Sequence, residues 1–497
     1  MTSADAEHFD VIVVGAGLSG IGAACRLRRE CPWASFTILE ARERIGGTWD
    51  LFRYPGVRAD SDMYTLGYSF QAWRGDEVLA GGERILAYLR DTAQRHGVAE
   101  HVRTGHRVVA AAWCAETASW TVSVQGPDGP HQLACRFLLL CTGYYRYDRG
   151  HSPDLPDADR FVGSVVHPQH WPAELDCSGR HVVVIGSGAT AVTLVPALSR
   201  SAAHVTMVQR SPSWVMVAPS RDPLAGWLQA RLPAGPAAAL VRAKNVAVMT
   251  MLYQLSRRRP RLIGSLLRAD ARRRLPPGYP VEIHFNPSYA PWDQRMCFVP
   301  DGDLFDAIAA GRASIVTDTV ERFTRRGLRL GSGRELEADV VVTATGIELL
   351  ALGGVRLTID GEPVALPERL VYRGMMLSGV PNLAITLGYT NASWTLKADL
   401  TARHVCRLLN HMRSRGHARC VAVLSESEPD RRPLIELRSG YVRRSLHEFP
   451  SQGSRRPWLA RQNYWLDVFD FRRGGVEDGV VCFQPAGGVG APVRRAR

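Results

Sequence analysis

The sequence contains almost no lysine: of 61 Lys and Arg residues, only Lys244 and Lys397 are lysines. Its ten cysteines form no C-x-x-C pair, which argues against a disulfide framework, a zinc site or a dithiol redox centre. No uncharged apolar run is long enough to cross a bilayer, and the polar, acidic first ten residues do not resemble a signal peptide. We therefore expect a cytoplasmic protein in a reducing compartment, with no bound metal.

The composition is that of a globular protein, with 45% hydrophobic and 22% charged residues among 497, enough for two or three domains. The net charge is +13, and the excess is concentrated between residues 221 and 274. No nucleic-acid-binding motif accompanies these arginines, so we expect no nucleic-acid partner. The simplest interpretation is a solvated basic face; the alternatives are peripheral contact with an anionic membrane, a partner protein, or cofactor phosphates.

A glycine-rich turn near the N-terminus is the first chemical signal. The apolar run 11–14 predicts a buried parallel strand, and Gly15, Gly17 and Gly20 follow in the spacing G-x-G-x-x-G before an Ala-rich helical segment. A second predicted strand ends in Glu40, whose carboxylate would accept hydrogen bonds from ribose hydroxyls and repel a 2′-phosphate. The whole unit predicts a site for the pyrophosphate of FAD or NAD.

The same construction occurs a second time. A strand is followed by Gly186, Gly188 and Ala191 in the spacing G-x-G-x-x-A, and Ala is tolerated at the third position. The next strand has no terminal acid and runs instead into Gln209, Arg210 and Ser211. A guanidinium and a hydroxyl suit a 2′-phosphate, so this unit predicts an NADPH site. A chain with both units resembles a flavoprotein that NADPH reduces.

The segment between the two units, "FVGSVVHPQHWP" at 161–172, has neither helical nor strand periodicity. Two apolar strands, ending at Gly143 and Gly346, indicate where the chain crosses between the nucleotide domains. The segment matches the F-x-G-x-x-x-H-x-x-x-W-P fingerprint of Baeyer–Villiger monooxygenases. A second motif of that family, [A/G]-G-x-W-x-x-x-x-[F/Y]-P-[G/M]-x-x-x-D, is matched at every fixed position by "GGTWDLFRYPGVRAD", residues 46–60.

The chain therefore resembles flavin-dependent Baeyer–Villiger monooxygenases along nearly its whole length, and most strongly the ethionamide-activating type, through "PWDQR", "GMMLSG" and "GYTNASWTLKADL". The resemblance implies that NADPH reduces FAD and that a peroxyflavin formed with O2 converts a ketone to an ester or lactone. Oxygenation of sulfur in thioamides or sulfides is an expected side activity. The expected partners are thus a small ketone or sulfur compound and O2.

The resemblance also assigns the site residues. Arg295, in "PWDQR", is the expected catalytic cation, and Asp60 is its expected partner. His167 is expected to be a structural residue of the interdomain linker. The predicted FAD-binding residues are Gly15, Gly17, Ser19, Gly20, Glu40, Gly47, Thr48, Trp49, Asp60 and Val108. The predicted NADPH-binding residues are Arg58, Gly186, Ser187, Gly188, Ala189, Thr190, Ala191, Gln209, Arg210 and Ser211.

The predicted fold class is α/β, with two doubly wound dinucleotide-binding domains and a helical insert in the second. The expected divisions are an FAD domain at 1–150 and 346–480, a linker at 151–174, an NADPH domain at 175–345 with its insert at about 220–290, and a disordered tail at 481–497. Two other functions remain open. One is a flavin monooxygenase that mainly oxygenates nitrogen or sulfur, and the other is a non-catalytic sensor of NADPH.

Overall fold

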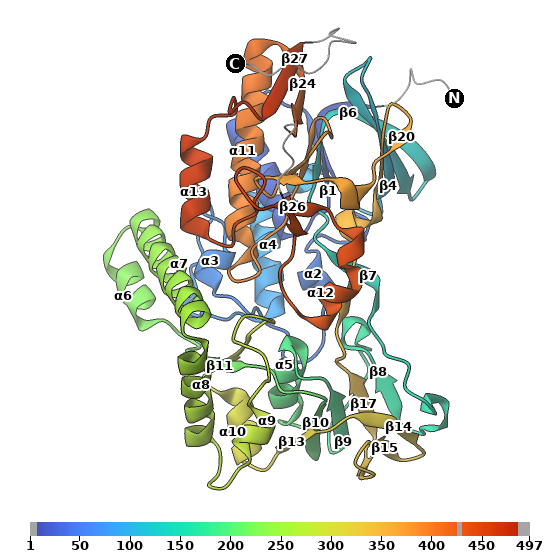
Figure 1. The fold of residues 1–497 in the computed structure, drawn as a ribbon, viewed down its shortest axis with the longest axis vertical. Helices are drawn as coiled ribbons and strands as arrows, with labels where there is room; N and C mark the ends of the chain where they lie inside the picture. Colours follow the sequence, from blue (N-terminus) through green and yellow to red (C-terminus); the bar gives the residue numbers. More distant parts are fainter. Residues whose placement is uncertain (1–6, 425–429, 486–497) are drawn as a thin grey trace.

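A computed structural model describes residues 7–424 and 430–485 of the chain. Two sheets dominate it, one in the upper and one in the lower part of Figure 1. The upper sheet has nine strands in the order β20-β19-β4-β5-β6-β1-β2-β3, with β23 also paired to β6. Its strands are β1 (His8–Val14), β2 (Phe36–Leu39), β3 (Val102–Arg103), β4 (Arg107–Cys114), β5 (Ser119–Gly126), β6 (Gly129–Leu140), β19 (Arg356–Ile359), β20 (Glu362–Pro363) and β23 (Leu383–Ile385).

The central strands of this sheet are parallel and buried on both faces. Val11, Ile12 and Val13 of β1 are fully buried, as expected of a continuous apolar run inside a parallel sheet. Helices pack over the strands (Figure 1). They are α1 (Leu18–Glu30), α4 (Gly82–Arg95) and α11 (Trp394–Arg415), with the short helices α2 (Thr48–Leu51) and α3 (Met63–Leu66) at the edge. Since α11 comes from the C-terminal part, the chain returns here to complete its first domain.

The lower sheet has five parallel strands in the order β13-β10-β9-β17-β8. Its strands are β8 (Ser164–Val166), β9 (His181–Ile185), β10 (His204–Gln209), β13 (Ala313–Thr317) and β17 (Val340–Thr343). Helices α5 (Ala189–Leu198) and α10 (Asp303–Ala309) pack against it. Both sheets carry the strand–turn–helix unit that the two glycine motifs predict, and the predicted α/β fold with two dinucleotide-binding domains is confirmed.

Four helices occupy the segment predicted as the helical insert. They are α6 (Pro223–Arg231), α7 (Ala234–Arg258), α8 (Pro260–Arg274) and α9 (Val281–His284), and the first three lie on the left of Figure 1. The parallel pair β11 (Val215–Ala218) and β12 (Cys297–Pro300) joins the two ends of this segment to each other. The insert is therefore tied at its base while its helices extend beside both domains.

The remaining elements are short and lie mostly in the C-terminal third. They are β14 (Val320–Thr324), β15 (Gly327–Leu330), β16 (Glu335–Glu337), β21 (Val371–Tyr372), β22 (Met376–Leu377), β24 (His417–Ala422), β25 (Arg431–Pro433), β26 (Ser451–Gly453), β27 (Val481–Pro485), α12 (Gly440–Ser445) and α13 (Tyr464–Arg473). Strand β27 pairs antiparallel with β24. The predicted disordered tail at 481–497 is thus wrong for 481–485, because Val481 and Cys482 are buried against β24. Residues 486–497 lie outside the described residues.

The two crossings between the domains lie side by side. Strand β7 (Tyr145–Gly150), which follows β6, pairs antiparallel with β18 (Ile347–Leu349), which follows β17. The fingerprint segment lies against this pair: the Gln169 side-chain amide donates to the carbonyls of Arg146 and Tyr147 at 2.9 and 3.1 Å. The fingerprint segment therefore contacts β7, where the chain passes from one domain to the other.

One expectation for the fingerprint segment is wrong. Its sequence has no strand periodicity, yet Ser164–Val166 form β8, the edge strand of the second sheet, paired with β17. Pro168–His170 form a single 3-10 turn immediately afterwards. The edge of β17 offers backbone N–H and C=O groups that need hydrogen-bond partners, and pairing with them fixes Ser164–Val166 as a strand. Three residues are too few to show strand periodicity in the sequence. The second domain thus begins inside the predicted linker at 151–174.

Candidate functional site

The first glycine turn is built by close backbone approach. Gly15 has φ of +101°, and a Cβ there would lie 2.7 Å from the carbonyl oxygen of Cys141. A Cβ on Gly20 would lie 1.8 Å from the carbonyl oxygen of Gly15, so helix α1 approaches the strand only because this residue is glycine. The N-terminus of α1, with no side-chain cap on its free N–H groups, faces the end of the sheet.

Glu40 occupies the position after β2 that the sequence predicts. Its carboxylate accepts hydrogen bonds from the main-chain N–H of Ala16 at 2.7 Å and of Arg42 at 2.9 Å. Burial raises the pKa of this carboxyl group, and the two main-chain donors partly offset that effect. The side chain is thereby fixed in the wall of the pocket beside the glycine turn.

The pocket beside this turn is lined by both domains. Nearly all of the predicted FAD residues line it: Gly15, Gly17, Ser19, Glu40, Gly47, Thr48, Trp49, Asp60 and Val108. Gly20 is the exception, because it packs α1 onto the strand one turn further along. Arg295, from the segment that follows the helical insert, also lines the pocket. We refer to this cavity as the flavin pocket from here on.

Arg295 and Asp60 form an ion pair in the wall of the flavin pocket. The Arg295 Nε and Nη2 lie 2.9 and 2.8 Å from Asp60 Oδ2, and Nη1 donates to the carbonyl oxygen of Thr390 at 2.9 Å. The two side chains are 27% and 35% exposed, so the pair borders the open part of the cavity. Three polar contacts from one planar guanidinium fix both its position and its orientation.

The charge of Arg295 is secured by its surroundings. Loss of hydration in the pocket wall would by itself lower the pKa of the guanidinium, but Asp60 and then Tyr144 outweigh that effect and raise it above its usual value. Arg295 therefore stays a cation at every physiological pH. A group that cannot lose its proton offers a fixed positive charge rather than an acid.

The turn that carries Arg295 is held by helix α7. Trp292 in this turn has φ of +70° and is buried, and its ring meets that of Tyr253 on α7 at 5.6 Å. Arg257, near the end of α7, contacts Asp293 at 2.6 Å. The helical insert thus braces the turn and aims Arg295 back towards the first domain.

Asp62, the neighbouring acid, has another task. It caps helix α3: its carboxylate accepts the main-chain N–H of Thr65 at 2.9 Å and the hydroxyl of the same residue at 2.6 Å. Burial raises the pKa of the Asp62 carboxyl group. Of the two acids, Asp60 alone lines the flavin pocket, in agreement with the motif position.

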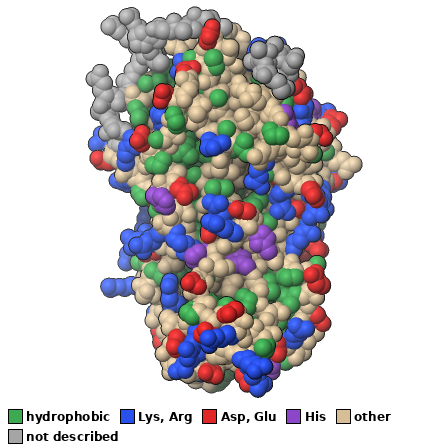
Figure 2. Space-filling view, turned by 90° about the vertical axis from the view of Figure 1, so that its right-hand side faces the viewer, with side chains coloured by type: hydrophobic (Ala, Val, Ile, Leu, Met, Phe, Trp, Pro, Cys, Tyr) green, Lys and Arg blue, Asp and Glu red, His purple; other side chains and the backbone are tan. Residues whose placement is uncertain are grey.

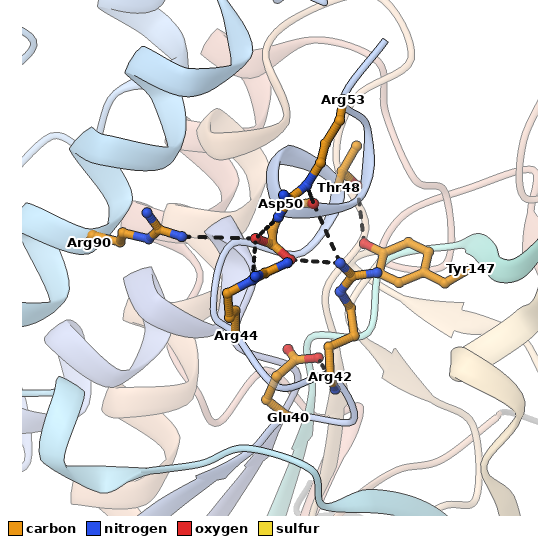
Figure 3. A network of polar contacts seen from close by, with 8 residues as sticks. All are labelled: Glu40, Arg42, Arg44, Thr48, Asp50, Arg53, Arg90 and Tyr147. Carbon is orange, nitrogen blue, oxygen red and sulfur yellow. Dashed lines mark hydrogen bonds and ion pairs between the residues drawn. The ribbon is translucent and has the colours of Figure 1, made fainter. Parts of the chain in front are cut away.

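A buried carboxylate that the sequence did not single out anchors one side of the pocket. Asp50 is 1% exposed and contacts Arg42 at 2.6 Å, Arg53 at 3.0 Å and Arg44 at 3.1 Å, with Arg90 at 3.9 Å (Figure 3). Burial would raise the pKa of Asp50, but these arginines, Arg42 foremost, hold it below its usual value. Arg42 and Glu40 both line the flavin pocket. The sequence signal for Asp50 was its place in the motif "GGTWD", but acids in such positions commonly cap a helix.

Aromatic side chains from separated segments complete the pocket wall. Trp394, at the start of α11, donates its Nε1–H to Ser19 Oγ at 2.8 Å, and the hydroxyls of Tyr147 and Thr48 lie 3.1 Å apart. Trp49, Tyr144, Tyr145 and Tyr389 also line the wall. The sequence assigned no role to Tyr144, Tyr145 and Tyr147, which come from β7 and the loop before it without a spacing pattern. Tyr389 and Trp394 lie in the motif "GYTNASWTLKADL", which was the available signal for them.

The second glycine turn is more open. Arg210 and Ser211, predicted to bind a 2′-phosphate, are exposed after β10, and Ser187 Oγ in the turn donates to the carbonyl oxygen of Ser211 at 2.9 Å. Gln209 is turned inward instead: it is 2% exposed, and its amide donates to the His284 carbonyl oxygen and Thr317 Oγ1, each at 2.9 Å. Its side chain therefore braces the strand end rather than facing solvent with Arg210.

The motif that ends in Asp60 spans both domains. Gly56 lies against Thr193 and Ala197 of α5, and Tyr54 packs in the core of the second domain. Arg58, expected to contact the nicotinamide nucleotide, pairs with Asp303 at the start of α10, with Nη1 to Oδ2 at 2.6 Å. The structure thus gives Arg58 a protein partner at the domain boundary and leaves it outside the wall of the flavin pocket.

His167 of the fingerprint uses both ring nitrogens on the main chain. Its Nδ1 accepts the N–H of Gln169 at 3.2 Å, and its Nε2 lies 3.2 Å from the carbonyl oxygen of Gly346. Burial lowers the pKa of the imidazole, which favours the neutral ring. This geometry supports the expectation of a structural rather than a catalytic histidine. Within the described part of the chain, no group of three His, Cys, Asp or Glu side chains is placed to hold a metal ion.

Two family models match the chain. A flavin-binding monooxygenase-like model matches residues 79–227, and an NAD(P)-binding Rossmann-like domain matches residues 13–77. Among solved structures, oxidised steroid monooxygenase bound to NADP superimposes with a TM-score of 0.76, at 20% identity over 96% of this chain and all of that one. Cyclohexanone monooxygenase from Rhodococcus sp. Phi1 bound to NADP+ superimposes with 0.69, at 17% identity over 84% and 87% of the two chains. These likenesses establish the fold.

Curated relatives are far more similar in sequence. The FAD-containing monooxygenase EthA of Mycobacterium tuberculosis is 51% identical over 95% of this chain and 97% of its own length. The putative FAD-containing monooxygenase MymA of the same organism is 48% identical over 97% and 98%, and the probable FAD-binding monooxygenase AlmA of Acinetobacter baylyi is 44% identical over 96% of each. The family resemblance inferred from the motifs is confirmed. The chain belongs to the family of FAD-containing monooxygenases.

Proposed function

We propose that this monooxygenase uses NADPH and O2 to convert ketones to esters or lactones, with sulfur oxygenation of thioamides or sulfides as a side activity. One observation carries the proposal: the Arg295–Asp60 pair stands in the wall of the flavin pocket, with contacts of 2.8 and 2.9 Å. The two residues are 235 positions apart and come from different domains. They are the pair that the motif resemblance associates with this reaction.

The residues around the pocket fit FAD. The turn at Gly15 and Gly20 leaves no room for side chains, the N-terminus of α1 offers free N–H groups for a pyrophosphate, and Glu40 is placed for ribose hydroxyls. Tyr144 and Trp394 offer apolar faces in the same wall. When bound there, FAD supplies the redox chemistry, with NADPH as reductant and O2 as oxidant.

The role of Arg295 follows from its charge and its fixation. Oxygen insertion next to a carbonyl builds negative charge on the carbonyl oxygen, and a preorganised cation stabilises that charge most where water is excluded. Arg295 keeps its proton, so it stabilises the charge without quenching it. Asp60 and the Thr390 carbonyl hold the guanidinium in one orientation, which avoids the cost of reorganising it during the reaction.

NADPH is the proposed reductant because of the residues after β10. Arg210 and Ser211 are exposed beside the second glycine turn, where Glu40 stands in the first. A guanidinium attracts a 2′-phosphate that a carboxylate would repel.

The alternative is a flavin monooxygenase whose main task is oxygenation of nitrogen or sulfur. A panel of ketones and sulfides, incubated with NADPH and oxygen and followed by product identification, separates the two. An ester or lactone formed from a simple ketone supports the proposal. Sulfoxide formation alone, with no ester from any ketone, would favour the alternative. As a prerequisite, the purified protein should be yellow, with about one FAD per chain.

The cellular setting also remains a proposal. None of the described helices is long and apolar enough to cross a bilayer. We retain a cytoplasmic location with peripheral membrane contact through the arginine-rich insert, because that segment combines basic charge with exposed apolar side chains.

A further inference from the structure

Exposed apolar side chains gather on one side of the molecule. Of fourteen large hydrophobic side chains that are exposed in the described residues, eleven lie on α6, α7, α8 and α13. These four helices form a column along the left of Figure 1. Scattered exposed hydrophobic residues are ordinary on a soluble protein, but a cluster of this kind marks a surface that meets something apolar.

Helix α7 carries four of these exposed apolar side chains along one face, which Lys244 interrupts between Leu240 and Val248. Leu240, Val248, Met251 and Leu255 fall within about 80° of one another on a helix of 100° per residue, and Met251 is 65% exposed. Trp227 of α6 and Leu262 of α8 are each 50% exposed. We call these six residues the apolar ridge. Val246, a buried residue midway along α7, lies on its opposite face.

The chain segment that carries the ridge has charge of one sign only. Residues 223–269 contain eight Arg or Lys and no Asp or Glu. Three of the eight pair with acids outside this segment: Lys244 with Asp222, Arg257 with Asp293, and Arg268 with Glu282. Arg258, Arg259 and Arg261, at the junction of α7 and α8, are exposed and make no ion pair within 7–424 and 430–485. The face in Figure 2, on the other side of the molecule, shows acidic and basic side chains interspersed. The ridge therefore has a border of net positive charge, in which Arg258, Arg259 and Arg261 form the unpaired part.

We propose that the apolar ridge and its arginine border dock onto the surface of a membrane that contains anionic phospholipid. Aliphatic side chains and Trp227 would enter the interface, while the arginines would contact headgroup phosphates. A second copy of the chain is disfavoured as the occupant, because the unpaired arginines of two copies placed face to face would repel each other. An anionic lipid surface instead satisfies both the apolar and the charged components.

The same helix reaches the flavin pocket from its inner face. Val246 of α7 packs against Tyr389 and Leu396, and Tyr389 lines the pocket. Tyr253, further along α7, supports the turn before Arg295. A protein docked through α7 would hold its pocket wall one helix diameter from the lipid. Resting on the proposed function, this geometry points to ketones that partition into the bilayer as the substrate class.

Vesicle co-sedimentation of the FAD-loaded full chain tests the docking. Sucrose-loaded vesicles of phosphatidylcholine alone are compared with vesicles that also contain phosphatidylglycerol. Two variants address the two components: Met251→Glu in the ridge, and Arg258→Gln with Arg261→Gln in the border. The matched controls are Val162→Glu, which is similarly exposed but remote, and Arg325→Gln with Arg334→Gln in the two turns of the β14-β15-β16 sheet.

We expect the wild type and both controls to bind the anionic vesicles, with binding weakened by added salt. Each test variant should bind at least tenfold more weakly while keeping its flavin and its melting temperature. Absence of sedimentation of the wild type, or equal binding of test and control variants, would overturn the proposal. So would a wild-type dimer, measured by light scattering, that Met251→Glu converts to monomer, because the ridge would then be a self-interface.

A second measurement addresses the substrate class. Oxidation of a long-chain ketone dissolved in the vesicles should slow severalfold in Met251→Glu, whereas that of a short water-soluble ketone should not change. Equal rates of the wild type and this variant on the dissolved ketone would overturn that part. If vesicle binding behaves as expected but no ketone is converted, the proposed function fails and the docking stands.

Discussion

The two glycine turns of this protein have the same local construction and different surroundings. After the first, Glu40 is buried and bonded to two main-chain N–H groups, and the pocket beside it is walled by both domains. After the second, Arg210 and Ser211 are exposed. An enclosed site suits a cofactor that stays bound, and an open one suits a nucleotide that arrives and leaves in each turnover. The difference lies in the burial around the turn and not in the turn itself.

The largest effect is expected on replacing Arg295, which reaches into the enclosed flavin pocket from the other domain. Arg295→Ala should lower ester formation per NADPH by about 10²–10³-fold, since one preorganised charge-stabilising donor contributes about 2.7–4 kcal/mol. FAD should stay bound, because the residues proposed to contact it lie around Gly15 and Glu40. Arg295→Lys should rescue little, since an ammonium lacks the planar fork that meets Asp60 and Thr390. The readouts are ester yield and stopped-flow flavin reduction. Near-normal ester yield in Arg295→Ala would mean that another residue is the catalytic cation.

A second test removes Asp50, the buried carboxylate that anchors one side of the enclosed flavin pocket. Asp50→Asn should lower the free energy of unfolding by about 3 kcal/mol, because it removes the buried carboxylate that several partly exposed arginines share. The control is Asp91→Asn, which removes an exposed pair with Arg95 and should cost at most about 0.5 kcal/mol. Denaturant titrations followed by flavin fluorescence measure both.

The stability difference between the wild type and Asp50→Asn should depend on pH with a definite sign. The arginines hold the pKa of Asp50 below its usual value, so its stabilisation is present above the unfolded pKa of about 3.9 and is lost as pH falls through the lower folded value. The stability gap between wild type and Asp50→Asn should thus be constant from pH 5 to 8 and shrink below about pH 4. A gap that grew on acidification would contradict this assignment.

The open site is tested by Arg210→Ala. Loss of a charge-assisted contact costs about 1.5–3 kcal/mol, so the KM for NADPH should rise about tenfold or more while that for NADH stays almost unchanged. Arg200→Ala, an exposed arginine after α5, is the matched control and should leave both values unchanged. Equal losses with NADPH and NADH in Arg210→Ala would assign the residue to structure.

The smallest effect is expected where the two sites communicate. Trp171→Ala or His167→Ala should keep the flavin and slow turnover severalfold, since the fingerprint contacts Gly346 and β7 at the domain crossing. His170→Ala, with an exposed side chain in the same turn, should behave as wild type. Flavin content and steady-state rates are the measurements. Loss of flavin or of folding in either test variant would show that the segment serves packing alone.

Residue patterns in the sequence determined the two nucleotide-binding units, since only glycine permits the backbone approach at Gly20 and Gly186. They also selected Asp60 over Asp62 and pointed to Arg295, because the motifs fix those positions. The helical insert was expected at about 220–290, and α6, α7, α8 and α9 lie there. The glycine turns depend on local sterics and spacing, which a single stretch of chain expresses by itself, whereas Asp60 and Arg295 followed from the resemblance to a family.

The tertiary structure decided what distant segments do to one another. Ser164–Val166 form a strand because they pair with the open edge of β17. Residues 481–485 form a strand because they pair with β24. The Gln209 side chain points inward because it donates to the His284 carbonyl oxygen on α9 and to Thr317 Oγ1 on β13. The aromatic pocket wall, the arginines around Asp50 and the one-sided apolar ridge likewise arise from segments far apart in the chain. Burial and hydrogen-bond satisfaction are properties of the assembled fold, so no local pattern announces them.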